Sequence, residues 1–189
     1  MQRLTPNPAV KRDAPKLPLR VGQGSAVMNG KIEVIEADLG RADHAKDILA
    51  LTAAYALDPM GNGGALPASV LDQLIEKLRS HPTTKVFLMY SAGSAVGIAT
   101  CFVGFSTFRA RPLLNVHDFA ILSDHRGKGL ARQLLDAVEA RARELGCCKV
   151  TLEVQENNVR ARRVYERSGL RQAVYGDSTG GALFYAKDL

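Results

Sequence analysis

A short turn in the middle of the sequence combines two glycines with two basic side chains. It reads Arg126-Gly127-Lys128-Gly129, and apolar residues at helical spacing follow it from Leu130 onward. Unpaired N–H groups at the start of a helix carry partial positive charge, and glycine lets an anion approach the backbone closely. These residue types favour an anion site, with a purely structural strand-to-helix turn as the alternative.

Two common phosphate-binding patterns do not match this turn. A P-loop requires Gly-x-x-x-x-Gly-Lys-Ser/Thr, whereas Lys128 is followed here by Gly129. A dinucleotide fingerprint requires a third glycine at the position where Arg132 stands. Taken alone, the turn therefore indicates an anion without identifying it.

The turn needs a strand before it and a helix after it, and the sequence predicts both. An apolar β-rich run occupies 113–122, and apolar residues at helical spacing mark a helix from 130 to 145 that Gly146 ends. Similar signals predict strands at 31–37, 84–90, 95–108, 148–155, 171–176 and 182–188, and helices at 41–57, 67–81 and 157–169. A strand, a crossover helix and another strand in the middle of this order require one parallel pair in a largely antiparallel sheet.

The first 30 residues differ in composition from the rest of the chain. They are rich in Pro, Gly and basic residues without periodicity, so we expect a disordered or loosely attached tail at 1–30 and one domain at 31–189. Five basic residues against one acidic residue in this tail account for four of the six net positive charges. The nearly neutral remainder and an aromatic content of 6% disfavour a nucleic-acid-binding protein, whose binding would be strongly salt-dependent.

Composition also bears on the cellular compartment. No apolar run approaches the roughly 18–20 residues of a membrane span, and the N-terminus lacks a signal-peptide pattern. The three cysteines, Cys101, Cys147 and Cys148, have no zinc-ligand spacing. We therefore expect a cytoplasmic protein with reduced thiols, no membrane contact and no metal site. Three histidines are expected to be exposed, namely His44, His81 and His125.

Two segments resemble the GNAT superfamily of N-acetyltransferases. The first, DFAILSDHRGKGLARQLL, is similar to the segment that binds acetyl-CoA there and carries the pattern Arg/Gln-x-x-Gly-x-Gly/Ala at 126–131. The second, TLEVQENNVRARRVYERSGL, is similar to the strand and helix that follow, with Asn158, Ala161, Tyr165 and Gly169 at matching positions and Leu170 in place of Phe. The resemblance covers about residues 31–189. It implies an α/β (α+β) fold of the GNAT type, in which a mixed, mostly antiparallel central sheet contains one splayed parallel strand pair and carries helices on both faces.

The resemblance implies that acetyl-CoA is the cofactor and assigns residues to it. The backbone of Phe119, Ala120 and Ile121 would bond the pantetheine arm and polarise the thioester carbonyl. Asn158 would contact the pantetheine, and Tyr165 would face the sulfur as the acid for the departing thiolate. The loop amides that would hold the pyrophosphate belong to Arg126, Gly127, Lys128, Gly129, Leu130 and Ala131.

An amine that attacks a thioester must also lose a proton. The region around His117 resembles the spermidine/spermine (diamine) acetyltransferase branch, which carries Glu-Asp-Phe there, so His117 stands where that branch has its proton-accepting glutamate. An imidazole that titrates near 6.5 suits this role, and the change from glutamate removes a negative charge that would attract a polyamine. Asp118 follows on the same strand, so its side chain should point to the opposite face and anchor a neighbouring backbone group or loop. The resemblance places the acceptor between Asp58, His117, Phe105 and Phe108.

The sequence thus predicts transfer of an acetyl group from acetyl-CoA to a primary amine, which is a small, polyamine-like or amino-acid-like molecule. Attack is expected to be direct, because no cysteine lies in either motif. A protein or peptide N-acetyltransferase stays open, as does a CoA-binding regulatory domain without turnover, which the presence of Tyr165 disfavours. A homodimer, common in the superfamily, is also expected.

Overall fold

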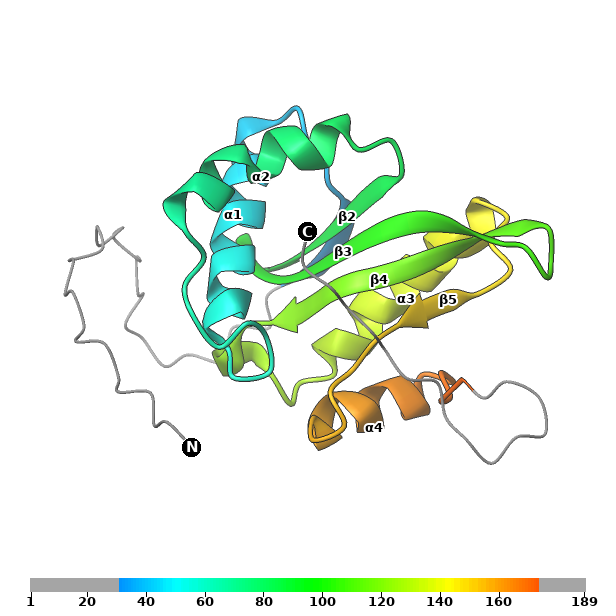
Figure 1. Ribbon diagram of the computed structural model, residues 1–189. Helices are drawn as coiled ribbons and strands as arrows, with labels where there is room; N and C mark the ends of the chain where they lie inside the picture. Colours follow the sequence, from blue (N-terminus) through cyan, green and yellow to red (C-terminus); the bar gives the residue numbers. More distant parts are fainter. Residues whose placement is uncertain (1–30, 174–189) are drawn as a thin grey trace, which may run out of the picture.

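The computed structural model describes residues 31–173, which form a five-stranded sheet with helices on both faces (Figure 1). The elements in chain order are β1 (Ile32–Glu36), α1 (Ala42–Leu57), α2 (Ala68–Ser80), β2 (Thr84–Ser91), β3 (Ser94–Ser106), β4 (Arg111–Ile121), a 3-10 turn (Ser123–His125), α3 (Leu130–Glu144), β5 (Val150–Leu152) and α4 (Val159–Arg167). This order confirms the sequence prediction for these residues.

Some predicted boundaries differ from those in the structure. The strand predicted at 148–155 is only three residues long, and the strand predicted to end at 108 ends at Ser106. The predicted tail at 1–30 lies outside the described residues. So does most of the predicted terminal strand pair, since only 171–173 are described, and these three residues carry no strand.

The sheet has the order β1-β2-β3-β4-β5, and only its last pair is parallel. This confirms the predicted mixed sheet with one parallel pair. The parallel register runs from Leu114 opposite Val150 to Val116 opposite Leu152, whereas β4 continues to Ile121. The two strands therefore part after three residue pairs, and the last five residues of β4 have no β5 neighbour.

Each face of the sheet is covered by a separate apolar cluster. Helix α3 packs its buried Leu134 and Val138 against Met89 and Val116 on one face. Helices α1 and α2 cover the other face, with residues such as Ile48 and Leu78 buried there. The predicted helices on both faces are thus confirmed, and the sheet is held as the middle layer of three.

A β-bulge at His117 changes the face that β4 presents. Thr100 pairs with Asp118 and Cys101 pairs with Val116, so His117 is an extra residue on β4. Val116 and Phe119 both pack on the α3 face, and the two residues between them line a cavity on the α1–α2 face. The prediction that His117 and Asp118 point to opposite faces is wrong, because the bulge interrupts the alternation of the strand.

Candidate active site

The glycine-rich turn joins the 3-10 turn to α3 and depends on two left-handed backbone positions. Gly127 and Gly129 both have φ of +77°, and Gly129 is the N-cap residue of α3. A Cβ built on either glycine would meet no atom within 4 Å. The backbone angle therefore requires glycine here, and open space beside the turn leaves room for a ligand.

This turn presents a row of backbone N–H groups. The first hydrogen bond of α3 runs from the N–H of Gln133 to the carbonyl of Gly129, and the N–H groups at 127–131 have no acceptor among the described residues. Arg126 differs from them, because its N–H donates to the carbonyl of Ser123 at 3.2 Å. Five of the six predicted pyrophosphate amides are therefore available to an anion.

The last residues of β4 offer backbone groups to the gap beside β5. The N–H of Leu122 donates to the carbonyl of Val96 on the β3 side, so by alternation Ala120 also faces β3 while Phe119 and Ile121 face the gap. The carbonyl of Ile121 is already occupied by Arg126 Nε at 2.7 Å. Of the three residues predicted to bond the pantetheine, Phe119 keeps both backbone groups open to the gap and Ile121 keeps its N–H.

Tyr165 lies on α4 and packs edge-on against Phe119, with ring centroids 6.0 Å apart. The residue is only 9% exposed, and burial, with a smaller contribution from Tyr55, raises the pKa of its phenol to about 12. No hydrogen-bond partner for its hydroxyl lies within 31–173. The side chain is thus a protonated donor at neutral pH, next to the open end of β4.

Two contacts fix α4 and so position Tyr165. Asn158 is the N-cap residue of α4, and its Oδ1 accepts from the N–H of Ala161 at 3.2 Å. At the other end of α4, Arg132 of α3 donates to the carbonyl of Arg167 at 2.8 Å. The Asn158 oxygen therefore serves the helix, which leaves its amide nitrogen for the predicted contact with pantetheine.

His117 and Asp118 line one cavity of about 260 Å³ between the sheet and helices α1 and α2. The His117 ring packs edge-on against Phe102, with centroids 5.7 Å apart. Burial raises the pKa of the Asp118 carboxyl above its usual range, and His117 partly opposes that shift. Within the described part of the chain this carboxylate accepts no hydrogen bond, so the anchoring contact predicted for Asp118 is not found there. Thr52, Leu74, Leu78 and Thr100 complete the lining.

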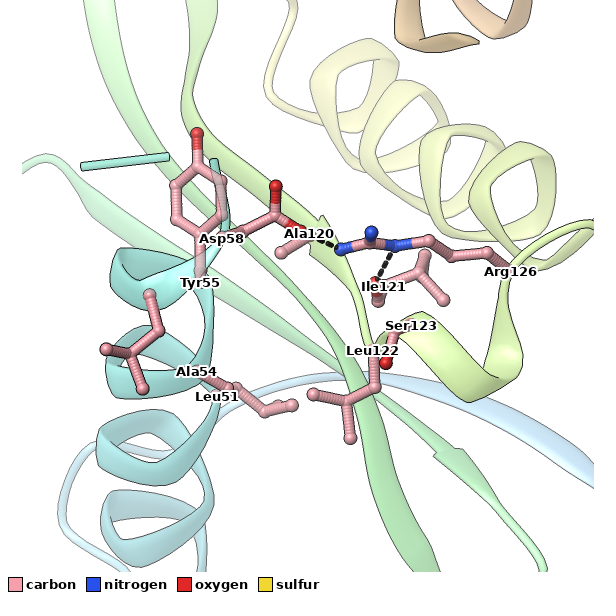
Figure 2. Close-up of a pocket in the computed structure, with 10 residues that line it drawn as sticks. Leu51, Ala54, Tyr55, Asp58, Ala120, Ile121, Leu122, Ser123 and Arg126 are labelled. Carbon is pink, nitrogen blue, oxygen red and sulfur yellow. Dashed lines mark hydrogen bonds and ion pairs between the residues drawn. The ribbon is translucent and has the colours of Figure 1, made fainter. Parts of the chain in front are cut away.

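A second cavity, of about 230 Å³, lies between α1 and the end of β4 (Figure 2). At its rim Arg126 Nη2 meets Asp58 Oδ2 at 2.5 Å, with 25% of the arginine side chain and 14% of the aspartate side chain exposed. The N–H of Met60 and then Arg126 hold the pKa of the Asp58 carboxyl below its usual range. A predicted acceptor residue and a predicted cofactor residue are therefore paired with each other. No local sequence pattern indicates this pair, because 68 positions separate the two residues.

The aromatic residues predicted as acceptor walls lie elsewhere. Phe105 is 64% exposed and Phe108 is 96% exposed, both beside the hairpin that joins β3 to β4. This hairpin and Ile121 are at opposite ends of β4, about 33 Å apart for an eleven-residue strand (Figure 1). The structure does not bring these phenylalanines together with Asp58 or His117.

Of the remaining histidines, two differ from expectation and one matches it. His44 is 7% exposed, and its Nδ1 accepts from the N–H of Asp38 at 3.0 Å, so the prediction that it is exposed is wrong. This hydrogen bond joins α1 to the segment that follows β1, and it places the His44 side chain in the interior. His125 is half-buried and His81 is exposed. Between residues 31 and 173 there is no cluster of three potential metal ligands, and no helix there has the length and apolar character for a membrane span.

The fold and the site together define a mixed α/β domain in which a helix start, whose first amides have no acceptor among the described residues, adjoins an opened sheet. A profile of the acetyltransferase (GNAT) family matches residues 51–170, and the chain belongs to this family.

Relatives agree with this assignment over shorter stretches. The chain is 39% identical over 57 residues to an uncharacterized N-acetyltransferase, YycN, of Bacillus subtilis (strain 168), which covers 30% of this chain and 36% of that protein. It is 33% identical over 89 residues to the N-alpha-acetyltransferase MAK3 of Arabidopsis thaliana, which covers 46% of this chain and 45% of that protein. The matched stretch thus spans less than half the length of either relative.

Solved structures share the fold. The ribosomal-protein-alanine N-acetyltransferase of Brucella melitensis biovar Abortus 2308 has a TM-score of 0.60 at 21% identity, over 82% of this chain and 100% of that chain. An aminoglycoside N-acetyltransferase in complex with CoA has a TM-score of 0.65 at 16% identity, over 86% and 98%. At these identities the likeness shows the fold alone.

Proposed function

We propose that the protein transfers the acetyl group of acetyl-CoA to a primary amine by direct attack. The observation that carries this proposal is the parting of β4 from β5 at the bulge. Beside the resulting gap lie the free amides at 127–131, the open backbone edge at Phe119 and the Tyr165 side chain. Family membership supports acetyl-CoA as the acetyl donor.

The residues around the gap fit this donor. The amides at 127–131 point away from any described acceptor at the start of α3, where a diphosphate is stabilised by N–H groups and the helix dipole. The N–H of Phe119 is suited to donate to the thioester carbonyl oxygen as negative charge develops on it. Fixed donors of this kind need no reorganisation during the reaction.

Tyr165 acts on the departing sulfur in this proposal. A phenol with a pKa of about 12 is fully protonated at neutral pH. Complete proton transfer to a thiolate whose thiol has a pKa near 8.5 would be uphill, so stabilisation by a donated hydrogen bond is the better-matched role. The ring is buried beside Phe119, and the hydroxyl has no protein partner within 31–173, so it is available to the sulfur.

His117 takes up the amine proton, with Asp118 beside it on the same cavity wall. The bulge supports this role, because it turns both side chains toward the α1–α2 face at the level where the strands part. An imidazole can accept and release a proton near neutral pH, directly or through water. An unchanged pH–rate profile in His117→Ala would contradict this assignment.

A small monoamine is the acceptor that the cavity supports best. Its walls are largely apolar with one carboxylate, whereas a polyamine of the spermidine type carries several charges. The names of two similar proteins, a ribosomal-protein-alanine N-acetyltransferase and an N-alpha-acetyltransferase, keep a peptide N-terminus as the second candidate.

Thiol release from acetyl-CoA in the presence of monoamines, polyamines, aminoglycosides and peptides tests the proposal. We expect turnover with at least one small monoamine and less with spermidine. Turnover only with peptides would favour the second candidate, and CoA binding without turnover on any amine would favour a regulatory domain. Residence in the cytoplasm and a homodimer remain predictions, and sedimentation analysis checks the latter.

A further inference from the structure

We propose that Asp58 and Arg126 form a clamp that holds the loop 58–64 across the gap, so that CoA binding and ordering of this loop are coupled. The inference rests on the proposed function in taking CoA as the ligand of the glycine-rich turn. It assigns the Arg126 side chain a positioning role in place of contact with phosphate.

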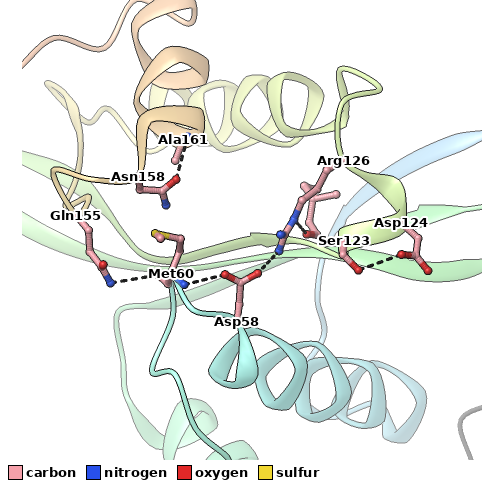
Figure 3. A network of polar contacts seen from close by, with 9 residues as sticks. Asp58, Met60, Ser123, Asp124, Arg126, Gln155, Asn158 and Ala161 are labelled. Carbon is pink, nitrogen blue, oxygen red and sulfur yellow. Dashed lines mark hydrogen bonds and ion pairs between the residues drawn. The ribbon is translucent and has the colours of Figure 1, made fainter.

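Three donor groups of Arg126 have partners among the described residues. Its backbone N–H is bonded to Ser123, its Nε donates to the carbonyl of Ile121 at 2.7 Å, and its Nη2 donates to Asp58 at 2.5 Å. The guanidinium is a rigid planar fork, so these two side-chain bonds fix its direction. The side chain therefore points from the turn toward α1, and it joins the end of β4 to the loop 58–64 (Figure 3).

The two carboxylate oxygens of Asp58 have different partners. Oδ2 binds Arg126, and Oδ1 accepts from the N–H of Met60 at 2.8 Å. The backbone carbonyl of Asp58 also accepts from the N–H of Gly61 at 2.8 Å. Asp58 thus links Arg126 directly to the backbone of the loop, and a shift of the arginine is transmitted to Met60.

The loop 58–64 also contacts the far side of the gap, where the chain continues after β5. Gln155, which follows β5, donates to the carbonyl of Met60 at 3.5 Å, a weak contact (Figure 3). A Cβ on Gly61 would come within 2.2 Å of the Tyr55 carbonyl, so the loop packs closely on the end of α1. The loop thus reaches from β4 to the segment after β5. The Asp58–Arg126 ion pair holds it on the β4 side, and the weak Gln155 contact holds it on the other side. The N–H of Gly64 also donates to the carbonyl of Ala56 at 3.0 Å, so the loop is tied to α1 as well, and the ion pair is its attachment to the β4 side.

Coupling follows from the place of Arg126 in the chain. It immediately precedes the amides at 127–131, so a diphosphate that fixes the turn also fixes the start of the arginine side chain. The loop is then held in one position above the gap while the cofactor is bound. Coupling is reciprocal, so an acceptor that orders the loop would also favour CoA binding.

Hydrogen exchange in the full-length protein at saturating CoA measures this coupling without an identified amine. In the wild type we expect CoA to slow exchange of the Met60 and Gly61 amides by at least about fivefold, the lower end of usual coupling. In Asp58→Asn, which keeps an oxygen for the Met60 N–H, the slowing should disappear. Asp124→Asn is the matched control, because it removes a carboxylate beside the same turn without touching the loop, and it should behave like the wild type.

Arg126→Lys provides the second variant. It keeps the positive charge but loses the planar guanidinium that bonds both Ile121 and Asp58, so it should also abolish the slowing of exchange while the Kd for CoA stays within about threefold.

Normal protection in Asp58→Asn or Arg126→Lys would overturn the clamp. A loss of CoA affinity of about 30-fold or more in Arg126→Lys, with Asp58→Asn unaffected, would mean that the guanidinium binds phosphate and would overturn it as well. Failure of the wild type to bind CoA would overturn the proposed function and the coupling with it, whereas CoA binding without loop protection overturns the clamp alone.

Discussion

Tyr165 shows how burial decides the chemistry of a single side chain. A hydroxyl with a pKa near 12 beside an open strand edge is a donor and not a base at neutral pH. Replacement by phenylalanine keeps the ring that packs against Phe119 and removes only this donor.

Tyr165→Phe should therefore lower kcat by roughly 10- to 1000-fold with little change in the Kd for CoA, because the lost interaction forms as charge develops on sulfur. Steady-state kinetics and calorimetry measure the two quantities. Tyr90→Phe is the control, since it loses a hydroxyl that bonds Asp47 away from the gap, and its kcat should not change. Equal kcat in Tyr165→Phe and the wild type would reduce Tyr165 to a packing residue.

The raised pKa of Asp118 can be tested through the folding stability of the protein, without an activity assay. Burial raises the pKa of its carboxyl, and the titratable groups that sense this charge are His117, Tyr55 and Cys101. A raised pKa means that the folded state binds this proton more tightly than the unfolded chain. Stability is therefore lost as pH rises from the unfolded pKa of about 3.9 through the folded value.

Asp118→Asn removes that penalty. Its Tm should exceed that of the wild type at about pH 8 and equal it at about pH 3, where the carboxyl is protonated in both states. Scanning calorimetry over this range measures the difference. A gain that is the same at every pH would indicate a packing effect.

At the scale of elements, the glycine-rich turn is where sequence and structure agree best. Its conformation follows from residues adjacent in the chain, so two glycines before a helical repeat suffice to predict the positive φ angles. The order of strands and helices was predictable for the same reason, since each has its own apolar periodicity.

Features that depend on pairing between distant segments were not predictable in this way. The bulge at His117 exists only in the register with β3, and a run such as Asn-Val-His-Asp-Phe carries no local sign of it. The Asp58–Arg126 pair likewise joins two loops that meet only after α1 has packed beside β4. Sequence therefore could not predict that His117 and Asp118 share one face or that Asp58 pairs with Arg126.

Gly129→Ala should weaken CoA binding by about tenfold or more, because a left-handed alanine costs on the order of 1 kcal/mol or more and its relief would move the amides of the turn. Calorimetric titration measures the Kd. Gly146→Ala is a matched control at the other end of α3, with φ of +69° and equally open space. It should cost similar stability while leaving the Kd unchanged, and a similar loss of affinity would show that the effect is global.

For the whole molecule, every residue that we place in the site lies between 52 and 165, within the part that matches the family. The basic segment 1–30, which carries four of the six net charges, lies outside the described residues.

A chain that lacks residues 1–30 should bind CoA with a Kd within about twofold of the full-length value at physiological salt, where charges more than about 8 Å away are largely screened. Calorimetric titration of both chains checks this. A large loss of affinity that grows as salt is removed would instead mean that the segment contributes electrostatic attraction for the cofactor.

The bulge at His117 also bears on which positions of β4 tolerate substitution. A bulged residue lacks a one-to-one backbone partner across the sheet, although the His117 ring still packs against Phe102 of β3. The residues on either side of position 117 keep their pairing with β3 whatever amino acid stands there, because the number of residues in β4 sets the register. We therefore expect position 117 to tolerate substitution better than its neighbours on β4, so that the proposed acceptor preference can change there while the residues proposed to bind the cofactor keep their places.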